Sequence, residues 1–284
     1  MPTVLEHKST PGLERSCRQG DWIRAAPACQ GLERIEARFL GHAFDPHRHD
    51  TYAIGVTTQG VQSFRYRGRA EQSLPGQVLV LHPDEIHDGH AGTETGFRYR
   101  ILYVDPGLIH DALAEWRYPL PFLREPVSDD RRLVAAVLPA LEELDRPLEE
   151  VERDQILLDL AEALAAADPS LPRRRVSARD WRAVERARDF LDGHLRQGSR
   201  SAALEAATGL GRYALARQFR ACLGTSPYRY LVMRRLDRAR ALIQQGRSLV
   251  EAALDSGFAD QSHMTRHFRK AYGLTPKRWA GLFV

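Results

Sequence analysis

The chain has 284 residues, of which 43% are hydrophobic and 27% are charged, and its formal net charge is +4. This length exceeds what one hydrophobic core usually organises, so we expect two domains. No apolar run approaches membrane length and the polar start does not resemble a signal peptide, so no membrane partner is expected.

The charge is divided unequally along the chain. Residues 173–284 contain 23 Lys and Arg against 9 Asp and Glu, a balance of +14, whereas residues 1–172 contain 18 against 28, a balance of −10. An acidic half joined to a basic half indicates a separate module that binds a polyanion. The alternative explanation of the basic half is a general richness in arginine.

The three cysteines, Cys17, Cys29 and Cys222, are odd in number and far apart, which favours a reducing cytoplasm as the location.

The first predicted elements are short strands between residues 32 and 105. Their residues alternate in polarity or are continuously apolar, and turn residues such as Gly60, Gly68 and Gly89 separate them. The predicted strands include Tyr52–Thr58, Val61–Tyr66, Gln77–Leu81 and Arg98–Val104. Several short strands at this spacing predict a small barrel or jelly roll.

Two segments of this region carry a resemblance. FDPHRHD at Phe44–Asp50 and GQVLVLHPDEIH at Gly76–His87 resemble the two motifs of cupins, in particular the arabinose-binding type of sensor domain. The resemblance implies a barrel that senses a small-molecule effector, and a barrel of this size can hold one small ligand. The residues expected to line the ligand site are His47, His49, Tyr52, Phe64, Tyr66 and His87. The alternative for the aromatic members is an ordinary place in the barrel core.

The three histidines raise the question of a metal. His47 and His49 lie at i and i+2 on one strand and His87 on a facing strand, and three imidazoles can chelate a divalent ion. However, the carboxylate that metal-binding cupins place shortly after the H-x-H is missing, and Asp84 replaces the glycine of the second motif. We therefore expect no metal, no cofactor and no catalytic residue, with the histidines bonding to neighbouring loops. A metal-dependent cupin enzyme is the competing hypothesis.

Two helical patterns and a linker follow the strands. The segments Asp129–Asp145, which Pro139 should bend, and Leu148–Ala167 each carry an apolar stripe. Each stripe can pack on the barrel or against a second copy of the chain. Prolines and an arginine run then predict a linker at residues 169–177, between a sensing domain at 1–168 and a DNA-binding domain at 178–284.

The basic half contains a repeated unit. Ser248–Trp279 reads as two short helices around a turn at Gly257, and its second helix, Gln261–Ala271, has an apolar seam and a basic outer face. The same pattern occurs at Leu204–Tyr230, with matching residues 49 positions apart. Between the copies, Ser226-Pro227 starts a helix of about five turns. Two helix-turn-helix units joined by one long helix are predicted.

Three ordered motifs resemble the AraC/XylS family of transcription regulators. They are GFADQSHMTRHF at Gly257–Phe268, GLTP at Gly273–Pro276 and GTSP at Gly224–Pro227, and Glu205 departs from the family's usual alanine. The resemblance implies an α+β chain with an N-terminal cupin-like β-barrel and accessory helices, and a C-terminal all-α domain. It implies sequence-specific binding to double-stranded DNA. RNA polymerase and a second copy of the chain are further candidate partners, and both activation and repression remain open.

The resemblance also implies which residues contact DNA. Arginine can read guanine or grip phosphate, tyrosine can bond phosphate, and glutamine suits adenine. The candidates on the first recognition helix, Arg212–Leu223, are Arg212, Tyr213, Ala216, Arg217 and Arg220. Those on the second are Gln261, Ser262, His263 and Arg266. For Arg217 and Arg266, which occupy matching places, the alternative is a structural bond to a neighbouring helix.

Overall fold

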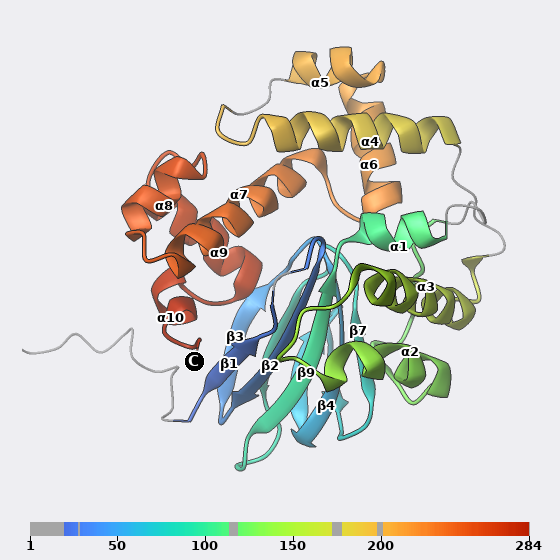
Figure 1. Cartoon of the computed structure of the whole chain (residues 1–284), viewed down its shortest axis with the longest axis vertical. Coiled ribbons are helices and arrows are strands. Elements are labelled where there is room, and N and C mark those ends of the chain that lie inside the picture. Colours follow the sequence, from blue (N-terminus) through green and yellow to red (C-terminus); the bar gives the residue numbers. More distant parts are fainter. Residues whose placement is uncertain (1–19, 28, 114–118, 172–177, 198–200, 284) are drawn as a thin grey trace, which may run out of the picture.

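A computed structural model describes residues 20–27, 29–113, 119–171, 178–197 and 201–283. Strands predominate up to Val104 and helices after it, which confirms the predicted α+β class (Figure 1). The strands are β1 (Trp22–Ala25), β2 (Leu32–Phe39), β3 (His42–His47), β4 (Tyr52–Gly60), β5 (Gln62–Tyr66), β6 (Arg69–Ser73), β7 (Val78–Leu81), β8 (His87–Ala91), β9 (Phe97–Val104) and β10 (Val127–Ser128). The helices are α1 (Pro106–Ala112), α2 (Arg131–Glu142), α3 (Glu150–Ala167), α4 (Ala178–Gly193), α5 (Ser201–Thr208), α6 (Arg212–Leu223), α7 (Pro227–Gln244), α8 (Leu249–Asp255), α9 (Gln261–Tyr272) and α10 (Pro276–Ala280).

The strands form two antiparallel sheets that share a core. One has the order β1-β2-β9-β4-β7-β10 and the other β3-β8-β5-β6. Alternation along β9 shows why the larger sheet is buried on both faces: Tyr99 and Ile101 join the cluster that contains Phe64 and Tyr66 of the smaller sheet, whereas Leu102 joins the cluster under the helices. The result is the cupin-like barrel that the motifs predicted.

Helices α1, α2 and α3 cover the outer face of the larger sheet (Figure 1). Pro139 lies inside α2, which nevertheless continues to Glu142. The buried Arg34 guanidinium donates to the carbonyl oxygens of Ala140 (3.3 Å), Glu143 (3.1 Å) and Arg146 (2.7 Å) at the end of this helix. Those carbonyls lack partners within a helix, so Arg34 ties the end of α2 to the sheet. Leu133 of α2 and Leu160 of α3 belong to the core cluster on the outer face of the larger sheet, so both apolar stripes contribute to packing on the barrel.

The helical half is divided between two cores. Helices α4, α5 and α6 share a separate cluster with Tyr230 and Leu231 from the first turns of α7. The later part of α7, with Val232 and Leu236, belongs with α8, α9 and α10 to the cluster that also contains the barrel interior. The first helix-turn-helix unit therefore has its own core, whereas the second is continuous with the barrel.

Local capping explains where the helices of both units begin and end. Ser226 accepts a hydrogen bond from the Arg229 backbone N–H at 3.2 Å, and Asp260 accepts one from the His263 N–H at 2.7 Å. Gly257 turns the chain with a φ of +89°, and a Cβ atom there would lie 2.6 Å from the Leu195 carbonyl oxygen. The Glu205 carboxylate, which departs from the family pattern, accepts a hydrogen bond from the Arg212 backbone N–H at 2.7 Å. It thereby supplies a partner for a backbone donor that has none within α6.

Candidate DNA-binding and effector sites

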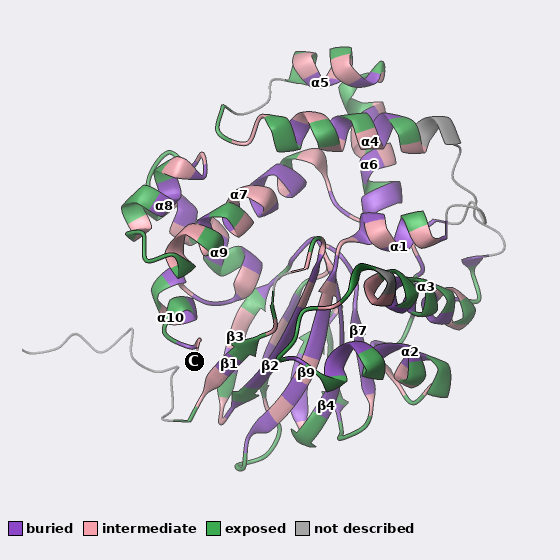
Figure 2. Ribbon diagram, viewed as in Figure 1, coloured by how far each residue is buried: buried purple, intermediate pink, exposed green. Residues whose placement is uncertain are grey.

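The first recognition helix, α6, presents its predicted contact residues to solvent. Leu215 and Phe219 are buried, and the opposite face is exposed or half-buried. Figure 2 shows that α6 carries both buried and more exposed residues. Tyr213 is 72% exposed, and its ring lies 5.1 Å from the Arg212 guanidinium carbon. A large aromatic ring and an arginine side by side on an exposed helix are suited to contact with a phosphate and a base edge.

The second recognition helix, α9, is arranged in the same way. Met264 and Phe268 are buried, while Gln261, Ser262 and Arg266 are exposed. The His263 ring is half-buried, with its Nε2 atom 3.0 Å from the Nε2 atom of His267. Burial, together with His263 and nearby cations, lowers the pKa of His267 to about 4. The structure therefore places the predicted contact residues of each unit on one helix, where all are exposed except the half-buried Ala216 and His263. Arg220 is also close to the barrel, because its guanidinium lies 3.9 Å from the Asp84 carboxylate.

The barrel and the DNA-binding half are joined by ion pairs of one polarity, with the carboxylates on the barrel and the guanidinium groups on the helices. Their N–O distances are 3.1 Å for Arg234–Asp50, 3.0 Å for Arg240–Glu33 and 3.1 Å for Arg229–Asp84, and Arg269 pairs with Asp45. The interpretation that the basic excess serves a polyanion is therefore incomplete, because part of it neutralises the acidic barrel.

Asp84 shows what this interface requires of the backbone. Its φ is +62°, in the left-handed region that favours glycine, where the cupin motif has a glycine. The Asp84 carboxylate lies 3.1 Å from Arg229, 3.5 Å from Arg48 and 3.9 Å from Arg220. A left-handed aspartate costs about 1 kcal/mol in backbone energy, and the three cations offset that cost. The departure seen in the sequence is therefore a contact between the two halves of the chain.

The end of α9 also rests on the barrel edge. The Asp45 N–H donates to the Gly273 carbonyl at 3.2 Å, and the Arg48 N–H donates to the Lys270 carbonyl at 3.1 Å. These bonds satisfy carbonyls at the end of the helix with donors at and just beyond strand β3. The second recognition helix is thus fixed at its carboxyl end while its amino end remains exposed.

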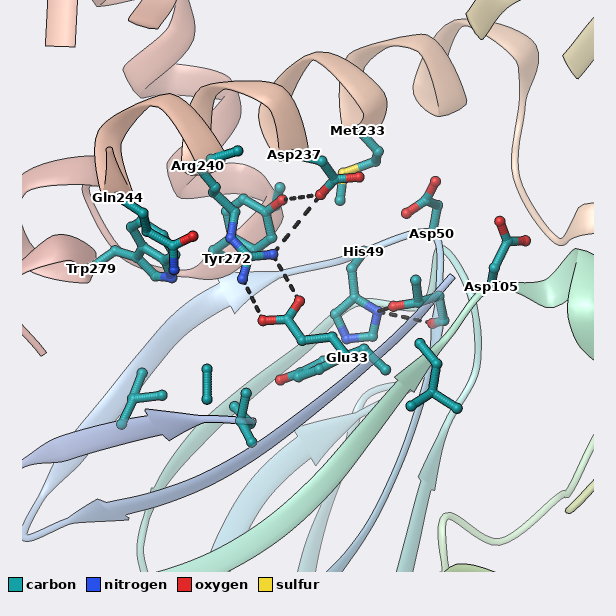
Figure 3. Close-up of a pocket in the computed structure, with 18 of the residues that line it drawn as sticks. Glu33, His49, Asp50, Asp105, Met233, Asp237, Arg240, Gln244, Tyr272 and Trp279 are labelled. Carbon is teal, nitrogen blue, oxygen red and sulfur yellow. Dashed lines mark hydrogen bonds and ion pairs between the residues drawn. The ribbon is translucent and has the colours of Figure 1, made fainter. Parts of the chain in front are cut away.

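A cavity of about 360 Å³ lies between the two halves. Strands β1, β2 and β3 form one wall, and α7, α9 and α10 supply the other, as Figure 3 shows. Arg240 reaches from α7 to Glu33 on β2, and its guanidinium carbon lies 5.0 Å from the ring centroids of both Tyr272 and Trp279. The cavity is mostly apolar with a few convergent charged groups, which is the usual composition of a small-molecule site.

The structure separates the residues that were predicted to line the effector site. His47 and His49 line the cavity, but His87, Tyr52, Phe64 and Tyr66 do not. The reason is the alternation of the strands, which directs the Tyr52 side chain to the outer cluster and the Phe64 and Tyr66 side chains to the closed barrel interior. Tyr52, Phe64 and Tyr66 are therefore core residues, which was the alternative for the aromatic residues of these strands.

Sequence reasoning missed the wall that the DNA-binding half contributes. The residues concerned are Met233, Arg234, Asp237, Arg240 and Gln244 on α7, with Tyr272 and Trp279 beyond it. Charged groups recurring every three residues along one stripe of a connecting helix were the available signal, because a solvated face does not require that spacing.

The three motif histidines meet behind this cavity. His47, His49 and His87 are buried, and one ligating nitrogen from each lies within 4.8 Å of the others. Burial and their mutual proximity lower the pKa of His47 and His49, and burial lowers that of His87 to about 4. All three imidazoles are therefore neutral at physiological pH.

His82, outside that cluster, holds the barrel to the loop before β10. Its Nε2 atom accepts a hydrogen bond from the Leu123 N–H at 2.9 Å, and its Nδ1 atom lies 2.8 Å from the Tyr66 hydroxyl. A backbone N–H can only donate, so this imidazole must be neutral. Burial, followed by Arg67, lowers its pKa to about 3, against the opposing effect of Asp168.

We expect this histidine to make the stability of the barrel depend on pH. The unfolded chain binds a proton to His82 near pH 6.5, whereas the folded chain does not until about pH 3. Stability should therefore fall as the pH drops through that window, by about 1.4 kcal/mol per pH unit for this residue. Urea unfolding at a series of pH values measures the slope, and His82→Gln should reduce it. An equal slope in both proteins would contradict the assignment.

Comparison with known proteins identifies two regions. Residues 30–161 match the family model of an AraC-like ligand binding domain, and residues 204–281 match a helix-turn-helix domain. A Bacillus subtilis protein described as an uncharacterized HTH-type transcriptional regulator, YbfI, is 28% identical over 81% of this chain and 86% of its own length. The transcriptional activator RhaS of Citrobacter koseri is 24% identical over 88% of this chain and 92% of its own.

The fold also has a relative among solved structures. ToxT from Vibrio cholerae superposes with a TM-score of 0.64, covering 90% of this chain and 100% of that one, at 11% identity. ToxT has also been solved with an unsaturated fatty acid bound, and this form superposes with a TM-score of 0.63 over 89% of this chain and 95% of its own. In the ranges that the structure describes, no helix combines the length and apolar character needed to cross a membrane.

Proposed function

Because this chain belongs to the AraC family of transcription regulators, with a ligand-binding barrel and a helix-turn-helix region, we propose that an effector bound between the two halves controls how α6 and α9 meet DNA. The observation that carries this proposal is the composition of the cavity. Its walls come from β2 and β3 on one side and α7 on the other, so any ligand there contacts both the sensor and the reader. A ligand that binds one arrangement of the halves more tightly shifts the population toward that arrangement.

We further propose the division of the chain into a sensing and dimerisation domain at 1–168, a linker at 169–177 and a DNA-binding domain at 178–284. Helix α3 ends at Ala167 and α4 begins at Ala178, which supports these limits. The shared core of the barrel and the second unit means that the two domains act as one body unless a ligand separates them.

The proposed protein partners are a second copy of the chain and RNA polymerase. Leu138 on α2 is 38% exposed and Leu158 on α3 is 39% exposed, which supports a contact between copies through these helices. Contact with RNA polymerase, and activation as the mode of regulation, rest on relatives named as activators, such as RhaS. The cytoplasm remains the proposed location.

The proposed readers are the exposed residues of the two recognition helices, and each unit should read its own base pairs. We expect Arg212→Ala or Tyr213→Ala to weaken binding at one short motif by about 1–3 kcal/mol, because a lost base contact acts only where it is made. Gln261→Ala or His263→Ala should do the same at the other motif. The two motifs are first identified by selecting bound DNA from a random pool, with and without small-molecule mixtures. Footprinting of each variant then measures its binding at each motif.

A matched control is available on the connecting helix. Tyr228 on α7 is 63% exposed and lies outside both recognition helices, so Tyr228→Ala should leave both motifs unchanged. If variants of the two units relaxed specificity at the same base pairs, the assignment of one motif to each unit would be wrong. If no sequence were enriched from the pool, the proposed function itself would fail.

A further inference from the structure

The cavity between the two halves has more carboxylates than cations in its walls. Among the described residues that line it, the acidic side chains are Glu33, Asp50, Asp105 and Asp237, and the basic ones are Arg234 and Arg240. Four carboxylates against two guanidinium groups leave two negative charges in excess. The two histidines of the lining do not offset this excess, because burial lowers the pKa of both. Buried charge is costly unless it is paired, so this cavity favours a cation.

The two arginines are shared among three of these carboxylates. Arg240 donates to Glu33 at 3.0 Å. Arg234 divides its charge between Asp50 at 3.1 Å and Asp237 at 3.2 Å. Burial raises the pKa of Asp50 to about 7, Arg234 opposes this rise, and Asp237 adds to it. The Asp50 carboxylate is therefore stabilised only in part by its arginine.

The fourth carboxylate, that of Asp105, lies close to Asp50. Both residues line a second cavity of about 10 Å³, which shares part of its wall with the large one. The Asp105 carboxylate accepts a hydrogen bond from the Gly107 N–H at 2.7 Å, but it forms no ion pair with any residue that the structure describes. Figure 3 shows Asp50 and Asp105 together at one end of the large cavity and Trp279 at the other. The excess charge is thus concentrated at one end.

Two arginines near this end lie outside the lining, and each faces a carboxylate of its own. Arg229 is paired with Asp84 at 3.1 Å. Arg188 lies near Gly107, and its charge is opposed by that of Asp192. Within the described part of the chain, no cation is therefore left to balance Asp105.

The small cavity also contains a polar atom without a partner. Thr225, between α6 and α7, is 1% exposed and lines this cavity. Its Oγ1 atom is buried and forms no hydrogen bond. Burial of an unpaired polar atom is unfavourable, so such atoms usually face a water molecule or a ligand. A space of about 10 Å³ has room for one small polar group.

We propose that the ligand of the large cavity is an organic amine, whose ammonium group binds in the small cavity between the Asp50 and Asp105 carboxylates and donates to the Thr225 hydroxyl. This inference rests on the proposed function, because it names the chemical class of the effector. An ammonium group has three donors and no acceptor, which matches two carboxylates and one hydroxyl oxygen. The rest of the molecule extends toward Trp279 and Phe283, because the large cavity is mostly apolar.

An ammonium group in this place joins the two halves of the chain. Asp50 and Asp105 belong to the barrel half, whereas Thr225 directly follows the first recognition helix and its C-cap, Gly224. The bound amine therefore adds one more cation between barrel carboxylates and the DNA-binding half. It stabilises the arrangement in which those groups are close together, and so changes how often that arrangement is populated.

Three ligands of nearly equal shape test this class on the full chain. 3-Phenylpropylamine, 3-phenylpropanol and 3-phenylpropionate present a cation, a neutral hydroxyl and an anion at the same end of one apolar body. Isothermal titration at neutral pH should show the amine binding at least about tenfold more tightly than the alcohol, because charge-assisted hydrogen bonds are the stronger ones. The acid should bind more weakly than the alcohol, because it adds a carboxylate beside two others.

Two variants locate the ammonium group. Asp105→Asn removes the charge and retains a residue that can cap α1, and it should weaken binding of the amine at least about tenfold. Thr225→Val has nearly the same shape and should weaken it severalfold without loss of thermal stability, because the hydroxyl is unpaired in the empty protein. Asp154, an exposed residue of α3 that lines neither cavity, supplies the control: Asp154→Asn should bind the amine as the unaltered chain does. Thermal unfolding checks that each variant is folded.

Several results would overturn the proposal. Binding of the alcohol or the acid as tight as that of the amine, or no binding of the amine, would exclude a cationic ligand. Unchanged affinity for the amine in both Asp105→Asn and Thr225→Val would place the ammonium group elsewhere. DNA binding by the same protein keeps the two proposals apart. Specific DNA binding by a chain that does not prefer the amine refutes only this inference, whereas amine binding that leaves DNA affinity unchanged refutes only the proposed control by the cavity.

Discussion

Insertion of about 5 base pairs between the two motifs read by one chain is expected to reduce its affinity nearly to the non-specific level. Helix α7 has 18 residues and is therefore about 27 Å long. It contributes Leu231 to the core of the first unit and Leu236 to that of the second, so both units are fixed to one rigid rod. Two such units can enter successive major grooves on one face of the duplex, about 34 Å apart.

Half a helical turn of added DNA moves one motif to the opposite face, where the rod cannot follow. Specific binding is typically about 10³–10⁷ times tighter than non-specific binding, so the loss should be at least a thousandfold. Gel-shift or fluorescence titration at fixed salt measures it, and the same insertion placed outside the two motifs is the control. Undiminished affinity for the interrupted site would mean that α7 bends or that one unit alone reads DNA.

Removal of the Glu33 carboxylate is expected to be among the most destabilising single changes in the chain. Arg240 is largely buried between the Tyr272 and Trp279 rings, and both of its terminal nitrogens donate to Glu33. Glu33→Ala leaves that guanidinium without its main partner, which typically costs about 3–5 kcal/mol. Urea unfolding of the full chain should show this loss in the free energy of unfolding. The contact between the barrel and α7 should be the part of the structure that is weakened most.

A surface pair of the same chemistry gives the comparison. Glu251 on α8 lies 3.3 Å from Arg247, and both side chains are about half exposed. Glu251→Ala should cost less, about 1–2 kcal/mol, because the exposed pair contributes little and the rest of the loss is the capping box that Glu251 forms with Ser248 at the start of α8. Combining Glu33→Ala with Arg240→Met should recover part of the lost stability, since no buried charge is then left unpaired. If Glu33→Ala and Glu251→Ala behaved alike, the Arg240 pair would not hold the domains together.

The sequence predicted the elements that depend on local pattern. The 49-residue repeat, the caps at Ser226 and Asp260 and the alternating strands each follow from neighbours along the chain, and the structure has all of them. The site was only partly predictable for a physical reason. Glu33 and Arg240 are separated by 207 positions, and nothing in either segment shows that they meet. The effector residues were therefore sought inside the barrel, where Phe64 and Tyr66 prove to be core.

Asp84 combines a feature that the sequence shows with a contact that only the folded chain shows. Its replacement of a motif glycine was visible in the sequence and counted against a metal. Only the folded chain shows that the residue serves another purpose, because its partner Arg229 lies 145 positions later. A departure from a family pattern can therefore report a contact between domains without changing the chemistry of the motif that contains it.

The ion pairs between the halves also limit how this regulator can be recombined with others. The arginines that pair with barrel carboxylates are Arg220, Arg229, Arg234, Arg240 and Arg269. Grafted onto a foreign sensor without matching carboxylates, they would be left to pair with phosphate, and each such contact steepens the dependence of log affinity on log salt by about 0.9. The chimaera would hold any duplex more tightly and discriminate less between sequences. The acidic barrel would thus set the background affinity of the DNA-binding half, and a sensor grafted in its place would have to supply matching carboxylates.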